Sequence, residues 1–249
     1  NEVELMIDLT NGLPEFGQPK EGFARSGIHT SEYGMWLVDR QAPTPSEKEV
    51  IESVPFMQGV YDFSNILGER VYENRSLTYV FEIKQQDYER RKINQTAIEN
   101  WLKKDGVAPL YDDHARGYYY MAKCTSVNTD DFYGGLRVTT TWDAYPFKIS
   151  ELPEGHDIWD EFNFELDASI LNEFQVNGEL EVNLFNIGAS SKVPVISATS
   201  DMTIIKGGVT YHIPVGESKS DSFRLNIGDN ILKIIGNGTI KFTWYKELL

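Results

Sequence analysis

The chain has 249 residues, a length that fits one or two domains. Its 38 acidic side chains outnumber its 23 Lys and Arg, and the formal charge of −15 excludes a protein that holds nucleic acid by clustered cations on its phosphates. Hydrophobic residues make up 41%, which is enough for buried cores. One cysteine, Cys124, excludes an internal disulfide framework, and no run of about 18 apolar residues predicts a membrane span.

The first part of the chain predicts strands around one helix, an α+β unit. Residues 41–55 are polar, hold three prolines and lack a hydrophobic period, so they predict a long loop or arm. Residues 76–84 are rich in β-branched and aromatic side chains and predict a strand. A helix is expected at 87–104, because Asp87 is a good N-cap and an apolar stripe follows it. The two strands expected after the helix are 117–127 and 135–144.

The last third of the chain predicts short strands separated by Gly, Asn and Asp, a pattern typical of a β-sandwich. Turns are expected at Asn177-Gly178 and at 236–238. The strands are expected at 179–185, 193–196, 202–205, 209–214, 223–227, 231–235 and 239–245. In the last of these, Ile240, Phe242 and Trp244 share one face, which predicts that Trp244 is buried. The fold class is therefore mostly β with one main helix, with a domain at 1–149, a boundary near Ser150 and a β-sandwich domain at 150–249.

Motifs for catalysis or metal binding are weak. The four histidines lack the spacing of metal ligands, so we expect no metal site and no cofactor. Asp112-Asp113-His114 could form an acid–base cluster, but no nucleophile motif accompanies it, and a solvated turn that caps a hairpin is the expected structure. Residues 151–181 hold ten acids and no Lys or Arg, which could include the carboxylate pair of a glycosidase, although a charged linker is the simpler interpretation.

A series of short motifs resembles a known family. They are Gly27-Ile28-His29, Val54–Phe63, the helix end Trp101-Leu102, Pro109–Asp113, Tyr119–Lys123, Thr139–Trp142 and Tyr145-Pro146. Their order resembles the distal tail proteins (Dit) of long-tailed phages that infect Gram-positive bacteria, lactococcal phages among them. Asn186-Ile187-Gly188, Pro194 and Ile227–Asn230 fit the smaller, galectin-like sandwich of that family. One departure is Phe56-Met57, where the family often has Gly-Arg.

The resemblance implies a structural protein of the virion, made in the host cytoplasm, and not an enzyme. Six copies would form a ring at the tail tip, with the N-terminal belt domains joining the tail tube protein to the tail-associated lysin or fibre protein. The C-terminal domains would hold baseplate or receptor-binding proteins. DNA would pass through the ring without being bound, because an acidic wall repels phosphates. The resemblance implies no membrane partner.

Ring contacts are expected in segments that lack a core of their own. The polar arm 41–53 and the loop that follows it meet this description, although a mobile loop is the alternative. The residues of the candidate ring-interface loop are Pro55, Phe56, Met57, Gln58, Gly59, Tyr61 and Asp62.

Two other classes of function stay open at this point. A carbohydrate-binding module for adhesion to the host wall would need exposed aromatic side chains on the C-terminal domain, such as Trp159, Tyr211 or Tyr245. A wall-degrading hydrolase would need two converging carboxylates, for which Asp160, Glu161 and Glu165 are candidates.

Overall fold

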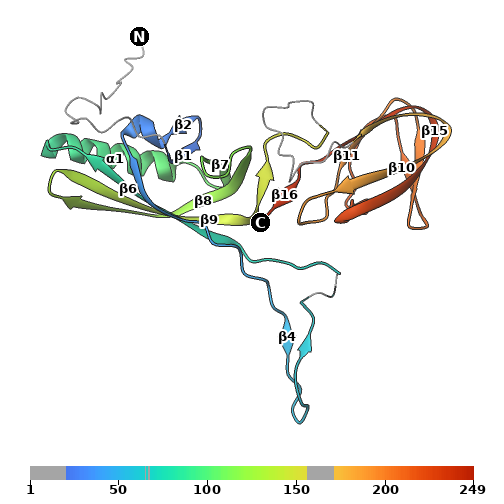
Figure 1. The fold of residues 1–249 in the computed structure, drawn as a ribbon, viewed down its shortest axis with the longest axis horizontal. Coiled ribbons are helices and arrows are strands. Elements are labelled where there is room, and N and C mark those ends of the chain that lie inside the picture. The colour runs from blue at the N-terminus through green and yellow to red at the C-terminus, as the bar shows by residue number, and fades with distance from the viewer. Residues whose placement is uncertain (1–20, 65, 67, 156–170) are drawn as a thin grey trace. The chain divides into compact units, whose positions relative to one another are not determined.

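The computed structural model describes residues 21–64, 66, 68–155 and 171–249 (Figure 1). The chain divides into two compact units between Lys148 and Ile149, and each is described here by itself. Among the described residues, no helix combines the length and the apolar character needed to cross a membrane.

The first unit is a sheet with one helix packed on it. Its main sheet has the strand order β2-β1-β7-β8-β9-β6-β3, and β4 and β5 form a separate two-stranded sheet. The elements are β1 (Phe23–Arg25), β2 (Ile28–His29), η1 (Thr30–Tyr33), β3 (Trp36–Gln41), β4 (Ile51–Glu52), β5 (Tyr61–Asp62), β6 (Arg75–Lys84), α1 (Tyr88–Lys104), β7 (Ala108–Asp112), β8 (Tyr118–Phe132) and β9 (Gly135–Ser150).

Helix α1 confirms the sequence prediction. The Asp87 carboxylate accepts a hydrogen bond from the Arg90 amide at 2.9 Å, as an N-cap should. The buried face of the helix carries Ile98, Trp101 and Leu102, which share one hydrophobic core with the alternate buried residues of β6: Leu77, Tyr79, Phe81 and Ile83. Alternation along β6 thus sends one set of side chains into the core beneath α1 and leaves the other set on the opposite face.

A buried arginine joins the start of the chain to the end of α1. The Arg25 guanidinium donates to the carbonyl oxygens of Ala108 and Ala122 at 3.0 Å each, and to that of Gly106 at 2.6 Å. It also lies over the ring of Trp142, 5.0 Å from the centroid. Burial removes water from this guanidinium and lowers its pKa. The carbonyl oxygens replace that water as hydrogen-bond partners.

The second unit is one sheet that curls into a half-barrel. The strand order is β13-β12-β15-β11-β14, and β10 pairs along the other side of β15. The strands are β10 (Glu173–Asn186), β11 (Val195–Ala198), β12 (Met202–Lys206), β13 (Val209–Ile213), β14 (Gly216–Ser218), β15 (Gly228–Thr243) and β16 (Glu247–Leu248). The expected β-rich domain is present, but β10 to β15 join a single six-stranded sheet where two packed sheets were expected, and β16 pairs with β9 and is not part of it.

Two predicted turns lie inside long strands. Asn177-Gly178 pairs with Asn237-Gly236 across β10 and β15, so neither Asn177-Gly178 nor 236–238 ends a strand. Gly236 has φ +153°, and a Cβ there would lie 2.8 Å from Met202 Cγ. Glycine lets β15 bend and lets β12 approach closely, which explains why the two predicted strands 231–235 and 239–245 are one. Residues 223–227 also differ from the prediction, because they form only an isolated bridge between Lys192 and Leu225.

The core of the second unit includes Trp244, which is 2% exposed, together with Ile240 and Phe242. This burial confirms the prediction drawn from the alternation along the last strand. The chain end is fixed inside the same unit, because the Ser150 amide donates to the Lys246 carbonyl oxygen at 3.0 Å and the Ala189 amide donates to that of Glu247 at 2.7 Å.

Candidate functional site

The segment between β3 and β6 is a long hairpin, here called the arm and defined as residues 46–73. Its strands are held by a sparse ladder: Glu73 N donates to Ser46 O at 2.9 Å, Lys48 N to Val71 O at 2.7 Å and Phe63 N to Val50 O at 2.8 Å. Short strands β4 and β5 pair near the far end, with Ile51 opposite Asp62. The arm leaves the main sheet as a thin projection (Figure 1). Sequence analysis predicted a loop or arm here but not the two strands.

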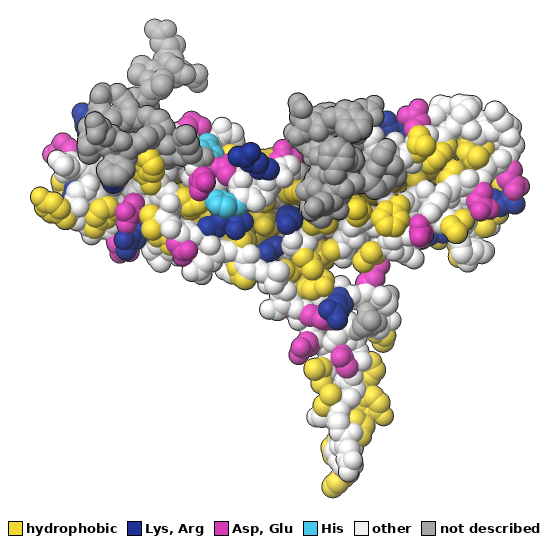
Figure 2. Space-filling model, viewed as in Figure 1, with side chains coloured by type: hydrophobic (Ala, Val, Ile, Leu, Met, Phe, Trp, Pro, Cys, Tyr) yellow, Lys and Arg dark blue, Asp and Glu magenta, His cyan; other side chains and the backbone are white. Residues whose placement is uncertain are grey.

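The arm exposes apolar side chains along its length. Figure 2 shows hydrophobic side chains on both sides of the projection. The exposed ones are Val50, Ile51, Val54, Phe56, Val60, Tyr61, Phe63, Ile66 and Val71. A two-stranded hairpin is marginally stable in water, and among the described residues no third strand pairs with β4 and β5. An exposed apolar surface of this kind is typical of an interaction site.

The candidate loop predicted from sequence lies at the tip of the arm. Met57 N donates to Val54 O at 3.1 Å, which closes a turn with Pro55 and Phe56 at its centre. Phe56 has φ +69°, a left-handed conformation that favours glycine, and its side chain is 108% exposed. The residue therefore carries backbone strain of about 1 kcal/mol and exposes its whole ring. Strain combined with exposure of an aromatic group points to a function outside the fold.

The other predicted residues surround this turn. Pro55, Gln58 and Gly59 are exposed, Met57 is half-buried, and Tyr61 and Asp62 form β5. Gly59 has φ +84°, so the chain needs glycine to reverse direction here. Hydrogen bonds from the Ser64 hydroxyl and amide lower the pKa of Asp62, and this contact joins the arm only to itself.

The base of the arm is fixed by a second buried arginine. Arg75 donates to the carbonyl oxygens of Pro43, Ala42 and Pro146 at 3.0, 3.1 and 3.3 Å. Its guanidinium also lies 5.2 Å from the centroid of the Tyr120 ring. Sequence reasoning did not identify Arg75, because its partners are backbone atoms up to 71 residues away.

The arm is acidic as well as apolar. Residues 46–73 hold six carboxylates and two cations. One of the cations, Arg70, lies 3.6 Å from Glu47 on the opposite strand. A partner for the arm must therefore offer apolar surface and must not add negative charge.

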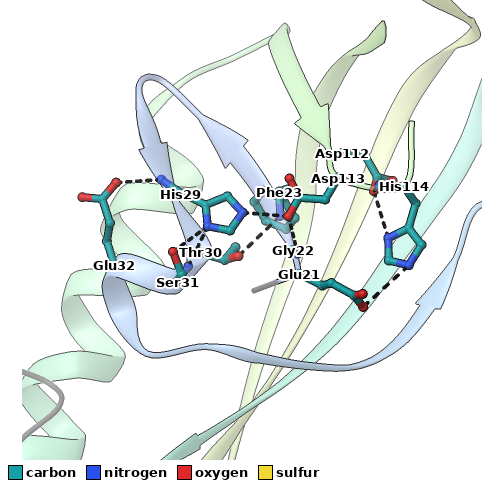
Figure 3. A network of polar contacts seen from close by, with 10 residues as sticks. All are labelled: Glu21, Gly22, Phe23, His29, Thr30, Ser31, Glu32, Asp112, Asp113 and His114. Carbon is teal, nitrogen blue, oxygen red and sulfur yellow. Dashed lines mark hydrogen bonds and ion pairs between the residues drawn. The ribbon is translucent and has the colours of Figure 1, made fainter. Parts of the chain in front are cut away.

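A second polar cluster lies where β1, η1 and β7 meet (Figure 3). Asp112 is buried and accepts hydrogen bonds from Tyr79 Oη at 2.7 Å and from Arg40 Nε at 2.8 Å. Burial and the neighbouring Asp112 carboxylate raise the pKa of Tyr79 well above its ordinary value. The expected solvated turn is therefore wrong for Asp112, which ties β3, β6 and β7 together.

The same cluster contains a serine, a histidine and an aspartate in contact. His29 Nε2 lies 3.0 Å from Asp113 Oδ2, and His29 Nδ1 lies 2.6 Å from Ser31 Oγ. However, Nδ1 also accepts the Ser31 amide at 3.2 Å, because His29 is the N-cap of η1. Its lone pair is therefore engaged by its own helix turn, and the arrangement is a structural cap. We expect a fluorophosphonate probe to leave Ser31 unlabelled.

Other candidate chemical groups are structural or lie outside the described residues. Burial raises the pKa of Cys124, which opposes formation of the reactive thiolate. In the part of the chain that the structure describes, no three His, Cys, Asp or Glu residues come together as a metal site. Trp159, Asp160, Glu161 and Glu165 lie outside the described residues. Tyr211 packs edge-on against Phe223, so it contributes to the core of the second unit and not to an aromatic platform.

Comparisons with known proteins give a relationship in fold. No family model and no curated protein sequence matches the chain. A solved structure of the Dit (gp 19.1) protein of phage SPP1, described as a paradigm of the hub adsorption apparatus in phages that infect Gram-positive bacteria, matches with a TM-score of 0.64 and 12% identity over 91% of this chain and 98% of that one. The phage P2 baseplate in its activated conformation with Ca aligns at a TM-score of only 0.39, with 9% identity over 86% and 90% of the two chains. The chain thus has the fold of a phage distal tail protein.

Proposed function

We propose that the chain is a structural, non-enzymatic hub protein of a phage tail tip, and that six copies close into a ring through their arms. The shared fold with SPP1 Dit supports the tail-tip role. The observation that carries the ring is the arm, which exposes nine large apolar side chains and has no core of its own. Contact with a neighbouring copy would cover this surface, and a stable contact needs more than about 1,000 Å² of buried area.

The two units take different parts in this proposal. The first, corresponding to residues 1–149, is the belt domain that joins the tail tube protein to the tail-associated lysin or fibre protein. The second, residues 150–249, corresponds to the galectin-like domain of the family and holds baseplate or receptor-binding proteins. The formal charge of −15 per copy supports a channel that lets DNA pass without binding it. A ring whose inner wall is rich in Lys and Arg would contradict that last point.

Light scattering and electron microscopy of the purified protein test the ring. We expect a particle with sixfold symmetry, alone or with the tail proteins added. A protein that stays a single chain at all concentrations, with and without those partners, would contradict the proposal.

Phe56→Gly tests the contribution of the arm tip. Glycine accepts the positive φ of this position, so the substitution leaves the fold intact and removes only the exposed ring. In the assembled ring the Phe56 side chain would be buried in the contact, so its removal is expected to weaken association roughly tenfold or more. Val107→Ser, which removes an exposed apolar side chain of the first unit outside the arm, is the matched control and should assemble as the wild type does.

A further inference from the structure

Lys148, near the end of β9, is a half-buried cation that no carboxylate pairs with among the described residues. Its ammonium lies 5.8 Å from the centroid of the Tyr118 ring. Burial, and after it the nearby charges of Arg75 and Arg40, lower the pKa of this ammonium. A cation that is removed from water beside two further cations is in an unfavourable place, and an anion bound next to it would be favoured.

Contacts along β8 place two of these cations over one face of the strand. Lys148 lies over the ring of Tyr118, and the Arg75 guanidinium lies 5.2 Å from the centroid of the Tyr120 ring. Residues i and i+2 of a strand point to the same face and are roughly 7 Å apart, so the two rings are neighbours. Arg75 also donates to the Pro146 carbonyl oxygen at 3.3 Å, two residues before Lys148. The ammonium and the guanidinium therefore lie over adjacent rings.

The third cation is Arg40 of β3, and it already has a carboxylate. Arg40 Nε donates to Asp112 Oδ2 at 2.8 Å. Burial raises the pKa of the Tyr120 hydroxyl, and the charges of Arg75 and Arg40 oppose that rise, which places both guanidiniums near this one hydroxyl. Within the described residues the group thus contains three cations and one carboxylate, that of Asp112.

Carboxylates that are close in sequence do not change this balance. Asp39 adjoins Arg40 along β3, and Asp143 adjoins the residue of β9 that is paired with Arg75. Alternation therefore puts both acids on the opposite face of the sheet, where each accepts a hydrogen bond from a side-chain amide at 3.0 Å. Asp113 lies 3.0 Å from a histidine nitrogen. The excess of positive charge beside Lys148 is therefore a property of this face of the sheet.

We propose that Lys148, Arg75 and Arg40 form an anion site whose ligand is an oxyanion, carried by a phosphate or a carboxylate group. Lys148 is the residue that contacts the ligand, because the donors of Arg75 are engaged by three carbonyl oxygens and Arg40 is bound to Asp112. The two arginines contribute through their charge, and the Tyr118 ring holds the ammonium in place. The site goes beyond the proposed function and does not depend on a ring.

Competitive acetylation of the wild-type chain tests the site. Acetic anhydride reacts with the neutral amine, and a bound oxyanion favours the ammonium form and covers it. Sodium phosphate or sodium acetate, at an ionic strength held constant with sodium chloride, should slow acetylation of Lys148 by about tenfold at saturation, which corresponds to one pKa unit. Lys123, exposed on β8, is the internal control and should keep its rate. Equal slowing of the two lysines would be a general effect of salt and would overturn the inference.

A pair of matched variants tests whether Lys148 holds the ligand. Lys148→Met removes the half-buried ammonium and keeps an apolar stem of similar length, so the variant should fold. Lys123→Met is the control from the same unit. The line width of the phosphorus resonance of phosphate, or of the carbon resonance of labelled acetate, measures binding. We expect binding at least tenfold weaker in Lys148→Met than in Lys123→Met, and equal binding by the two variants would contradict the site.

The two probes distinguish the sources of the oxyanion. Slowing of Lys148 acetylation by phosphate and not by acetate supports a phosphate group as the ligand. Slowing by acetate and not by phosphate supports a carboxylate, such as one on a partner protein. Slowing by neither anion overturns the inference, and it does so whether or not six copies form a ring, so this failure is separate from failure of the proposed function.

Discussion

The first unit contains two long hairpins that differ in what supports them. The β8–β9 hairpin lies against α1 and is joined to it by hydrogen bonds and by the ion pair between Lys92 and Asp131. The arm is also a long hairpin, but among the described residues it is fixed to the rest of the unit near its base, where Arg75 donates to three carbonyl oxygens. The β8–β9 hairpin is thus supported along its length by its own chain, and the described part of the arm is not.

The difference teaches how exposure should be interpreted. Both tips expose an aromatic ring, Tyr133 in one and Phe56 in the other. Only the arm adds a continuous set of apolar side chains behind its tip, and only its tip holds a non-glycine residue at positive φ. Tyr133 is therefore a single exposed ring on a supported hairpin, whereas Phe56 ends a hairpin whose apolar side chains are exposed along its length.

The largest effect is expected at the base of the arm. Arg75→Met removes a buried guanidinium and leaves the carbonyl oxygens of buried Pro146 and of Ala42 and Pro43 without their charged donor, and we expect a loss of about 3 kcal/mol in the free energy of unfolding. Urea unfolding measures it. Arg70→Met is the control, because that side chain is mostly exposed and its ion pair with Glu47 is long, so a change above about 0.5 kcal/mol there would weaken the argument.

Substitution of glycine by alanine should lower the free energy of unfolding at the β8–β9 hairpin but not at the arm. At Gly135 a Cβ would lie 2.4 Å from the Ile83 carbonyl oxygen, a backbone atom that cannot move alone, and we expect Gly135→Ala to cost about 2 kcal/mol or more. At Gly59 nothing lies within 4 Å of the new Cβ, and only the positive φ opposes it. Gly59→Ala should therefore alter amide exchange within the arm and leave global unfolding unchanged. Equal losses at both sites would contradict the comparison.

Removal of the aromatic rings near the tips gives a smaller contrast. Phe132 packs on Gly135, so Phe132→Ser should lower the free energy of unfolding by about 1 kcal/mol. Phe56→Gly should change it by less than about 0.5 kcal/mol, because relief of the strained φ offsets the added freedom of the unfolded chain. Thermal unfolding of dilute protein, below the concentration at which it assembles, measures both.

The smallest effect is a dependence on pH. The hydrogen bond from Lys92 lowers the pKa of Asp131 below its ordinary value of 3.8. A lowered carboxyl pKa adds stability that is present above 3.8 and is lost as the pH falls through the folded-state value. Amide exchange at the β8–β9 tip, corrected for its intrinsic rate, should therefore increase only in strong acid. Asp131→Asn should remove this dependence, and persistence of the dependence in that variant would assign it to another group.

The sequence predicted those parts of the fold that depend on local patterns. Asp87 and the apolar stripe behind it identified α1, and the strands expected at 202–205 and 209–214 correspond to the paired strands β12 and β13. The bend of β15 was not predictable, because Gly236 marks a close approach of Met202 and looks the same in sequence as a turn glycine. Long-range hydrogen bonds have no local signal either, and so Arg25 and Arg75 went unnoticed.

The arm was predicted as a segment without a core of its own, but not as a hairpin, and its role in ring contacts stays a prediction. Prolines and the lack of a hydrophobic period indicated that 41–55 had no core, which agrees with the exposed arm. The pairing of β4 with β5 was missed, because both faces of the arm are exposed and the alternation that marks a half-buried strand is absent. The left-handed conformation of Phe56 was also invisible, since that position favours glycine.

The position of Arg25 has a consequence for folding during synthesis on the ribosome. Its carbonyl partners, Ala108 and Ala122, are 83 and 97 residues further along the chain. Strand β1 leaves the ribosome early, yet it cannot complete its contacts until β7 and β8 have been synthesised. Strand β1 is therefore among the last strands of the first unit to complete its contacts, and a nascent chain that stalls before residue 122 would present an unfinished sheet edge to its surroundings.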